Sequence, residues 1–330
     1  MRALITGGRG FVGRWLAQHL ASSGDEVIVV DAEVDVTDER AIGRAVEEAA
    51  PDAAYHLAAR THVGESWGAP LEVLRVNVLG TAAVLDALRR HAPRAVALVV
   101  SSSEVYGAPE RPERPERPER SGSEPVQVGP TPVGSVEAAA LSEDSPVRPL
   151  SPYAASKAAA EEVAMQARRG HGQRVIVVRP FNHVGPGQAP TFAVPALASR
   201  ILAARREGAT SLRVGTLTTR RDFTDVRDVV VAYRLLSEAG RPGTVYNVCS
   251  GRSVEMSVIA ARLMAICGVS LELEPDPALV RPAEVPVLVG DPRRLHEATG
   301  WAPRIALEDT LRDVVADLEG AALAPRAESP

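Results

Sequence analysis

The chain has 330 residues, 45% of them hydrophobic, which suits one large α/β domain with a smaller domain appended. Its net charge of −5 argues against general affinity for nucleic acid, and no apolar run approaches the roughly 20 residues that cross a bilayer. The chain opens directly on a strand-like run without a signal-peptide pattern, so we expect a cytoplasmic protein that binds neither nucleic acid nor membranes. Cys249 and Cys267 lie in apolar stretches, which predicts reduced core thiols and no metal site.

Short apolar runs and amphipathic segments alternate through the first half of the chain. Strands this apolar, separated by helices, are typical of a parallel sheet with helices on both faces. The fold class that we predict is therefore α/β, a doubly wound parallel sheet of the Rossmann type. The predicted strands are residues 2–6, 26–30, 53–57, 95–100 and 173–178, and the predicted helices are 11–20, 71–90 and 151–169.

The second half is less regular and has loops rich in Pro, Arg and Gly. We interpret residues 1–180 as a dinucleotide-binding domain and residues 181–330 mainly as a smaller, C-terminal substrate-binding domain. Elements at about 215–250 are expected to return to the main sheet. The predicted helices here are residues 192–206, 226–238 and 254–266, and the predicted strands are 211–214, 245–248 and 271–273.

A low-complexity insertion occupies residues 108–145. Its segment Pro109–Arg120 consists of tandem Pro-Glu-Arg units. Proline at every third position prevents a helix and removes backbone donors, which predicts polyproline II or irregular structure. Two interpretations stay open: a solvated surface insertion without a role, or a lid or docking loop beside the active site.

A glycine-rich turn joins the first predicted strand to the first predicted helix. Gly7 permits a tight turn, Gly10 lets a pyrophosphate approach the backbone, and Gly13 lets the helix pack close to the strand. The helix N-terminus then faces the phosphates of a dinucleotide. This context predicts NAD or NADP as the coenzyme.

Two residues give conflicting indications of which coenzyme is used. Asp31 follows the second strand, where a carboxylate accepts from the adenosine ribose hydroxyls, and this favours NAD. Arg9, inside the turn, is suited to a 2′-phosphate, which favours NADP. His56 is predicted to be packed and hydrogen-bonded rather than catalytic. The other residues expected around the coenzyme are Phe11, Val12, Asp35, Val36, Leu57, Ala58, Ala59, Asn77, Tyr153, Lys157 and Pro180.

Candidate catalytic groups follow the fourth strand and begin the helix at 151–169. Tyr153 and Lys157 are four residues apart, so both lie on one helix face. A free tyrosine titrates near 10, and a nearby ammonium favours its phenolate. Ser102 lies at the carboxyl edge of the sheet, where it can hydrogen-bond the same reacting oxygen. The set is suited to moving a proton while a hydride moves at the nicotinamide.

These motifs appear in a familiar order: the glycine turn, His-Leu-Ala-Ala at 56–59, Val-Asn-Val-Leu-Gly-Thr at 76–81, Ser-Ser-Glu-Val-Tyr-Gly at 102–107 and Ser-Pro-Tyr-Ala-Ala-Ser-Lys at 151–157. The chain resembles the extended short-chain dehydrogenases, which include nucleotide-sugar epimerases, dehydratases and reductases. Arg-Pro-Phe-Asn-His-Val-Gly-Pro-Gly-Gln at 179–188 resembles the substrate loop of GDP-4-keto-6-deoxy-D-mannose reductases.

The resemblance implies reduction of GDP-4-keto-6-deoxy-D-mannose to GDP-D-rhamnose with NADH or NADPH, and a homodimer formed through two helices of the dinucleotide domain. Tyr153 would give the proton, Lys157 would lower its pKa and hold the nicotinamide ribose, and Ser102 would position the carbonyl. The substrate residues implied are Thr61, Ser103, Asn182, Arg221, Arg281 and Glu284.

Two alternatives stay open. A 4,6-dehydratase or 4-epimerase would keep its coenzyme bound, and Glu104 occupies the position of the base in the family's dehydratases. A non-enzymatic dinucleotide sensor is the other, and an intact Ser102, Tyr153 and Lys157 argue against it.

Overall fold

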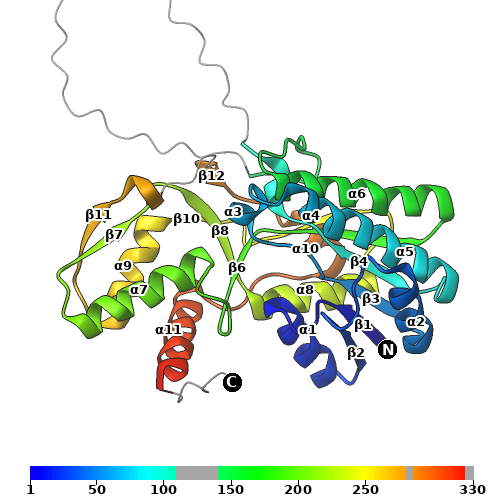
Figure 1. Cartoon of the computed structure of the whole chain (residues 1–330), viewed down its shortest axis with the longest axis horizontal. Coiled ribbons are helices and arrows are strands. Elements are labelled where there is room, and N and C mark those ends of the chain that lie inside the picture. Colours follow the sequence, from blue (N-terminus) through cyan, green and yellow to red (C-terminus); the bar gives the residue numbers. More distant parts are fainter. Residues whose placement is uncertain (109–139, 280–284, 324–330) are drawn as a thin grey trace, which may run out of the picture.

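The main sheet has six parallel strands in the order β2-β1-β3-β4-β5-β9 (Figure 1). A computed structural model of the chain describes residues 1–108, 140–279 and 285–323. The sheet order reverses beside β1, which opens a crevice at the carboxyl edge of the strands. The predicted Rossmann-type α/β fold is confirmed. The strands are β1 (Arg2–Thr6), β2 (Glu26–Val30), β3 (Ala53–His56), β4 (Val96–Val100), β5 (Arg174–Pro180) and β9 (Val245–Val248).

Helices cover both faces of this sheet because its strands are apolar on both sides. Along β5, Val175 and Val177 belong to one buried cluster, and Ile176 and Val178 belong to the other. One face is covered by α2 (Glu39–Ala49), α5 (Gly80–His91) and α6 (Pro152–His171), and the other by α1 (Phe11–Ser22), α8 (Val226–Ala239) and α10 (Arg293–Thr299).

Helix α2 was not predicted, although the sequence carries its signals. Asp38 caps it, accepting from the backbone N–H groups of Arg40 and Ala41. Ile42 and Val46 then lie on one buried stripe.

The helix predicted at 71–90 is divided into α4 (Pro70–Leu74), a π-helical segment η1 (Arg75–Leu79) and α5. The wider π turn places Asn77 inside the fold, where its Nδ2 donates to Ser156 Oγ at 2.8 Å and to the Arg60 carbonyl oxygen at 3.1 Å. These buried bonds tie the segment to α6 and to the loop after β3.

A second, smaller lobe follows β5. Of the range 215–250, β9 pairs with β5 in the main sheet and α8 packs against that sheet. In contrast, β8 lies in a second sheet, between β10 and β12, and also pairs with β6. The helix predicted from 254 begins at Met256, because Val254 pairs with Arg221 in an antiparallel ladder. The lobe contains β6 (Asn182–Val184), β7 (Ser211–Val214), β8 (Arg220–Asp225), β10 (Ser253–Glu255), β11 (Glu272–Pro275), β12 (Val287–Leu288), α7 (Ala193–Glu207), α9 (Met256–Cys267) and α11 (Leu307–Leu323).

Short turns complete the fold: α3 (Val63–Ser66), η2 (Ser103–Tyr106) and η3 (Pro277–Leu279). Cys249 and Cys267 are buried free thiols, as predicted. Within the described ranges, no helix has the length and apolar character to cross a membrane, and no cluster of potential metal ligands occurs. The Pro-Glu-Arg units of the predicted insertion lie outside the described residues.

Candidate active site

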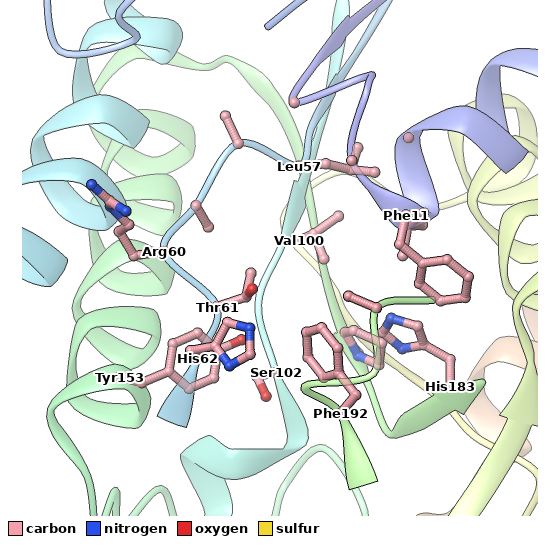
Figure 2. Close-up of a pocket in the computed structure, with 18 of the residues that line it drawn as sticks. Phe11, Leu57, Arg60, Thr61, His62, Val100, Ser102, Tyr153, His183 and Phe192 are labelled. Atoms are coloured by element: carbon pink, nitrogen blue, oxygen red, sulfur yellow. The ribbon is translucent and has the colours of Figure 1, made fainter. Parts of the chain in front are cut away.

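A cavity of about 980 Å³ runs along the carboxyl edge of the main sheet (Figure 2). Its lining includes the loops that follow β1, β2, β3, β4 and β5 and the start of α7. Most of the predicted site residues line it: Gly7, Arg9, Gly10, Phe11, Val12, Gly13, Asp31, Asp35, Val36, Leu57, Ala58, Ala59, Thr61, Ser102, Ser103, Glu104, Tyr153, Lys157, Pro180 and Asn182.

Four predicted site residues are placed otherwise. Asn77 does not line the cavity; it is 1% exposed and holds the loop that does. Arg221 lies on β8 outside the cavity lining, and its Nη1 donates to the Arg220 carbonyl oxygen at 2.9 Å. Arg281 and Glu284 lie outside the described residues.

The glycine turn is closely packed against the loop after β3. Gly7 has φ +71°, and a Cβ there would lie 2.8 Å from the backbone nitrogen of Ala58. A Cβ on Gly13 would collide with the carbonyl oxygen of Gly7. Gly10 ends the turn as the N-cap of α1, without a side-chain cap. The α1 amides therefore face the cavity, as a diphosphate requires, so these residues fit the predicted coenzyme.

The two residues that give conflicting indications of the coenzyme, Arg9 and Asp31, both line the cavity and contact each other. The Arg9 backbone N–H donates to Asp31 Oδ2 at 2.7 Å, which fixes that carboxylate. The Arg9 guanidinium pairs with Glu33 at 2.9 Å, so part of its charge is neutralised. Sequence reasoning missed Glu33.

The four predicted catalytic residues, Ser102, Glu104, Tyr153 and Lys157, all line the same cavity. Ser151 caps α6 through the Ala154 N–H at 3.1 Å, which places Tyr153 in the first turn. The Lys157 ammonium, one turn later, donates to the Val100 carbonyl oxygen at 2.8 Å. Ser102, two residues after the end of β4, interacts with the Tyr153 phenol (Figure 2).

Burial governs the protonation of both titratable groups. It raises the pKa of Tyr153 to about 12, while the Ser102 hydroxyl acts in the opposite direction. It lowers the pKa of Lys157 to about 8, against the opposing effect of Glu161. This differs from our expectation that Lys157 would lower the Tyr153 pKa: burial and the Glu104 charge raise it, and the Ser102 hydroxyl is the group that lowers it. At neutral pH the phenol holds its proton and the lysine is charged.

A buried ion pair supports the helix that carries these groups. Glu161 lies one turn beyond Lys157 and pairs with Arg179 of β5 at 2.7 Å, and both side chains are almost fully buried. Ser101 also donates to Glu161, and the Arg179 guanidinium lies 4.8 Å from the centre of the Tyr106 ring. Sequence reasoning missed this pair, although the spacing of Tyr153, Lys157 and Glu161 on one helix face was available.

Three residues with ring side chains that were not predicted also line the cavity: His62, His183 and Phe192. His62 and Phe192 contact each other with ring centroids 4.8 Å apart, and His62 Nε2 lies 3.2 Å from Thr191 Oγ1 (Figure 2). His183 stacks on Phe11, and burial lowers its pKa. These rings all belong to the lining of the cavity.

His56, expected to be packed rather than catalytic, is buried between two hydroxyls. Its Nδ1 lies 2.7 Å from Thr6 Oγ1 and its Nε2 lies 3.0 Å from Thr81 Oγ1. Burial lowers its pKa to about 3, so the ring is neutral.

Known proteins resemble this chain along most of its length. The model of the NAD dependent epimerase/dehydratase family matches residues 3–249. A GDP-6-deoxy-D-mannose reductase of Pseudomonas aeruginosa is 37% identical over 322 residues, covering 96% of this chain and 97% of that protein. A dTDP-glucose 4,6-dehydratase of Streptomyces niveus is 29% identical, covering 96% and 92%.

Solved structures agree with this. RMD from Pseudomonas aeruginosa, complexed with NADPH, has a TM-score of 0.81 and 34% identity, covering 97% of this chain and all of that one (100%). UDP-glucose 4-epimerase from Thermus thermophilus, in complex with NAD, has a TM-score of 0.80 and 27% identity, covering 97% and 100%.

Proposed function

Since the chain belongs to the NAD dependent epimerase/dehydratase family, we propose that it reduces the 4-keto group of a nucleotide-activated 4-keto-6-deoxy sugar with NADH or NADPH. The substrate proposed is GDP-4-keto-6-deoxy-D-mannose and the product GDP-D-rhamnose. The observation that carries the proposal is the 37% identity to a GDP-6-deoxy-D-mannose reductase over almost the whole chain. We also propose that the enzyme works in the cytoplasm.

The catalytic groups are suited to the reductive direction. The bound coenzyme would supply the hydride to C4 of the sugar. Tyr153, whose pKa of about 12 keeps it protonated, donates its proton to the carbonyl oxygen as that oxygen becomes negative. Ser102 hydrogen-bonds the same oxygen and holds it beside the phenol. The Lys157 ammonium stabilises the phenolate that remains.

We assign residues of the cavity lining to each part of the coenzyme. Asp31 accepts from the adenosine ribose, and the amides of the glycine turn and α1 bind the diphosphate. Lys157 contacts the nicotinamide ribose. For the substrate we assign Thr61, Ser103 and Asn182, which line the same cavity as Tyr153. Arg281 and Glu284 are assigned to the substrate by the resemblance.

The decisive experiment follows coenzyme absorbance at 340 nm with purified enzyme and GDP-4-keto-6-deoxy-D-mannose. The proposal predicts oxidation of one coenzyme, mole for mole with the product. Parallel assays with NADH and NADPH show which coenzyme the enzyme uses, since Asp31 favours NADH and Arg9 favours NADPH.

A second candidate function is a 4,6-dehydratase or 4-epimerase. The observation in favour is that Glu104 lines the same cavity as Ser102 and Tyr153, and that dehydratases are among the relatives. Conversion of GDP-mannose or another sugar nucleotide without net use of coenzyme would establish this alternative and reject the reductase.

The pH dependence of the reduction should follow Lys157. Its folded pKa of about 8 lies below the usual lysine value of 10.5, so the ammonium is present below pH 8 and is lost above it. We expect kcat/KM at saturating coenzyme to fall above about pH 8 with one ionisation, because the neutral amine no longer stabilises the phenolate. Initial rates measured from neutral to alkaline pH test this. A rate that stays level well above the Lys157 pKa contradicts it.

We further propose that the protein is a homodimer through α4, η1 and α6. Leu71 is 79% exposed and Leu79 is 59% exposed, and both belong to an apolar depression completed by Ala159 of α6. An exposed apolar surface of this kind is stabilised when a second copy of the chain covers it, which removes the leucine side chains from water.

Substitution Leu79→Glu is expected to convert the dimer to a monomer, because it places a charge in the apolar contact. Light scattering after size exclusion measures the mass. Val258→Glu is the matched control: Val258 is 41% exposed on α9, in the other lobe, and its substitution should leave the dimer intact. A wild-type protein that runs as a monomer contradicts the proposal.

A further inference from the structure

The hydroxyl of Tyr233 is a buried polar group that the catalytic scheme does not use. Tyr233 is 0% exposed, yet it lines the cavity that contains Tyr153 and Lys157. Its hydroxyl oxygen has no hydrogen-bond partner among the residues that the structure describes. A buried hydroxyl without a partner costs free energy, and most such groups in proteins are paired. A partner supplied by a bound molecule would explain this arrangement.

Tyr233 reaches the cavity from the opposite face of the sheet to Tyr153. It lies on α8 and belongs to the core cluster shared by α1, α8 and α10, whereas α6 covers the other face. The two phenols nevertheless interact electrostatically. Tyr233 therefore lies at the end of the cavity that Tyr153 lines, and it packs in the same apolar cluster as Val100. This is the end that we assign to the nicotinamide.

A second buried tyrosine, Tyr55, provides a comparison, because its hydroxyl has a hydrogen-bond partner on the same helix, α8. Tyr55 of β3 is also 0% exposed, and its hydroxyl lies 2.7 Å from Ser237 Oγ, one turn of α8 beyond Tyr233. The helix thus satisfies the tyrosine that faces the core and leaves unsatisfied the one that faces the cavity.

We propose that the Tyr233 hydroxyl donates a hydrogen bond to the carboxamide oxygen of the bound nicotinamide and so fixes the rotation of that ring relative to Tyr153. Burial raises the pKa of Tyr233, so the phenol is protonated and able to donate. The carboxamide is the one hydrogen-bonding group that the nicotinamide ring carries. The inference requires only that the chain binds a nicotinamide coenzyme, whichever sugar it acts on.

The test replaces Tyr233 with Phe, which removes the oxygen alone. Binding is measured without sugar, by quenching of protein fluorescence with NADH and NADPH. Loss of one neutral hydrogen bond is expected to weaken coenzyme binding about 3- to 10-fold. The affinity for ADP-ribose, or for its 2′-phosphate if NADPH is preferred, should not change because these compounds lack the nicotinamide.

A second measurement separates this role from a structural one. Without coenzyme, Tyr233→Phe should unfold at the same temperature as wild type or higher, because it removes an unpaired buried hydroxyl. The matched control, Tyr55→Phe, should do the reverse: a lower unfolding temperature, because the bond to Ser237 is lost, with unchanged coenzyme affinity.

Two results would overturn the inference. One is unchanged affinity of Tyr233→Phe for the coenzyme. The other is equal weakening for the coenzyme and for ADP-ribose, which would mean that the substitution disturbs the whole cavity. Neither result depends on which sugar reaction the enzyme performs, so this inference and the proposed function fail separately.

Discussion

Replacing Tyr153 with Phe is expected to lower kcat about 10²- to 10⁴-fold, the range associated with loss of a general acid. The proton required by the reduced oxygen would then have to come from water, since Ser102 is a much weaker acid. The Tyr153 ring remains to pack against Ser102, so the coenzyme dissociation constant should change little. Single-turnover absorbance at 340 nm measures the rate of the chemical step, and fluorescence quenching measures binding.

A matched control uses another buried tyrosine. Tyr246 of β9 is 2% exposed, and its hydroxyl accepts from the Arg241 N–H at 3.0 Å, away from the cavity. Tyr246→Phe should retain the wild-type kcat. If Tyr153→Phe kept kcat within about tenfold of wild type, the proton donor would be another group, with Glu104 as the next candidate.

Replacing Glu161 with Gln should destabilise the protein by about 3–5 kcal/mol, because the substitution leaves the Arg179 charge buried without its partner. The side chains of this pair are 7% and 6% exposed, so water cannot take the place of the carboxylate. Urea unfolding, followed by circular dichroism, gives the change in free energy. Glu162→Gln, on the same helix, is the control: its pair with Arg169 is 76% and 63% exposed and should contribute less than about 1 kcal/mol.

A double substitution tests the cause of that loss. If the unpaired charge is responsible, adding Arg179→Met to Glu161→Gln should recover part of the stability, because no buried charge remains. Additive losses would show that packing, not charge, accounts for the effect.

The sequence predicted the main sheet because its strands are local, apolar and separated by helices. It did not predict the second sheet, whose strands β10 and β12 are only 3 and 2 residues long. Its central strand, β8, begins Arg220-Arg221-Asp222, which has no apolar alternation, and its pairs are set by residues such as Ser253, far along the chain. The π-helical segment around Asn77 could not be predicted from the sequence either, because it depends on the buried hydrogen bond from Asn77 to Ser156.

The site was predictable where its chemistry lies within one short motif. The glycine turn and the Tyr153–Lys157 pair depend on spacing within a turn or a helix, which the sequence displays directly. Glu33 and Tyr233 were missed because their roles come from tertiary position: in the sequence Tyr233 is one more apolar residue of a core helix. Arg221 was assigned to the substrate by resemblance; it lies on β8 outside the cavity lining, and its role in binding stays a prediction.

The two ends of the low-complexity insertion are each fixed to the scaffold. Val105, just before it, accepts from the Arg148 N–H at 2.9 Å, and Gly107 is packed so tightly against Arg148 that a Cβ there would collide with its carbonyl oxygen. Leu141, near its C-terminal end, donates to Val289 and accepts from Asp291 through the backbone. The catalytic helix therefore takes its position from these anchors, whatever the length of chain between them. Because loop closure costs only about 0.6 kcal/mol for each doubling of length, a change in the number of residues between these anchors should have little effect on the stability of the scaffold.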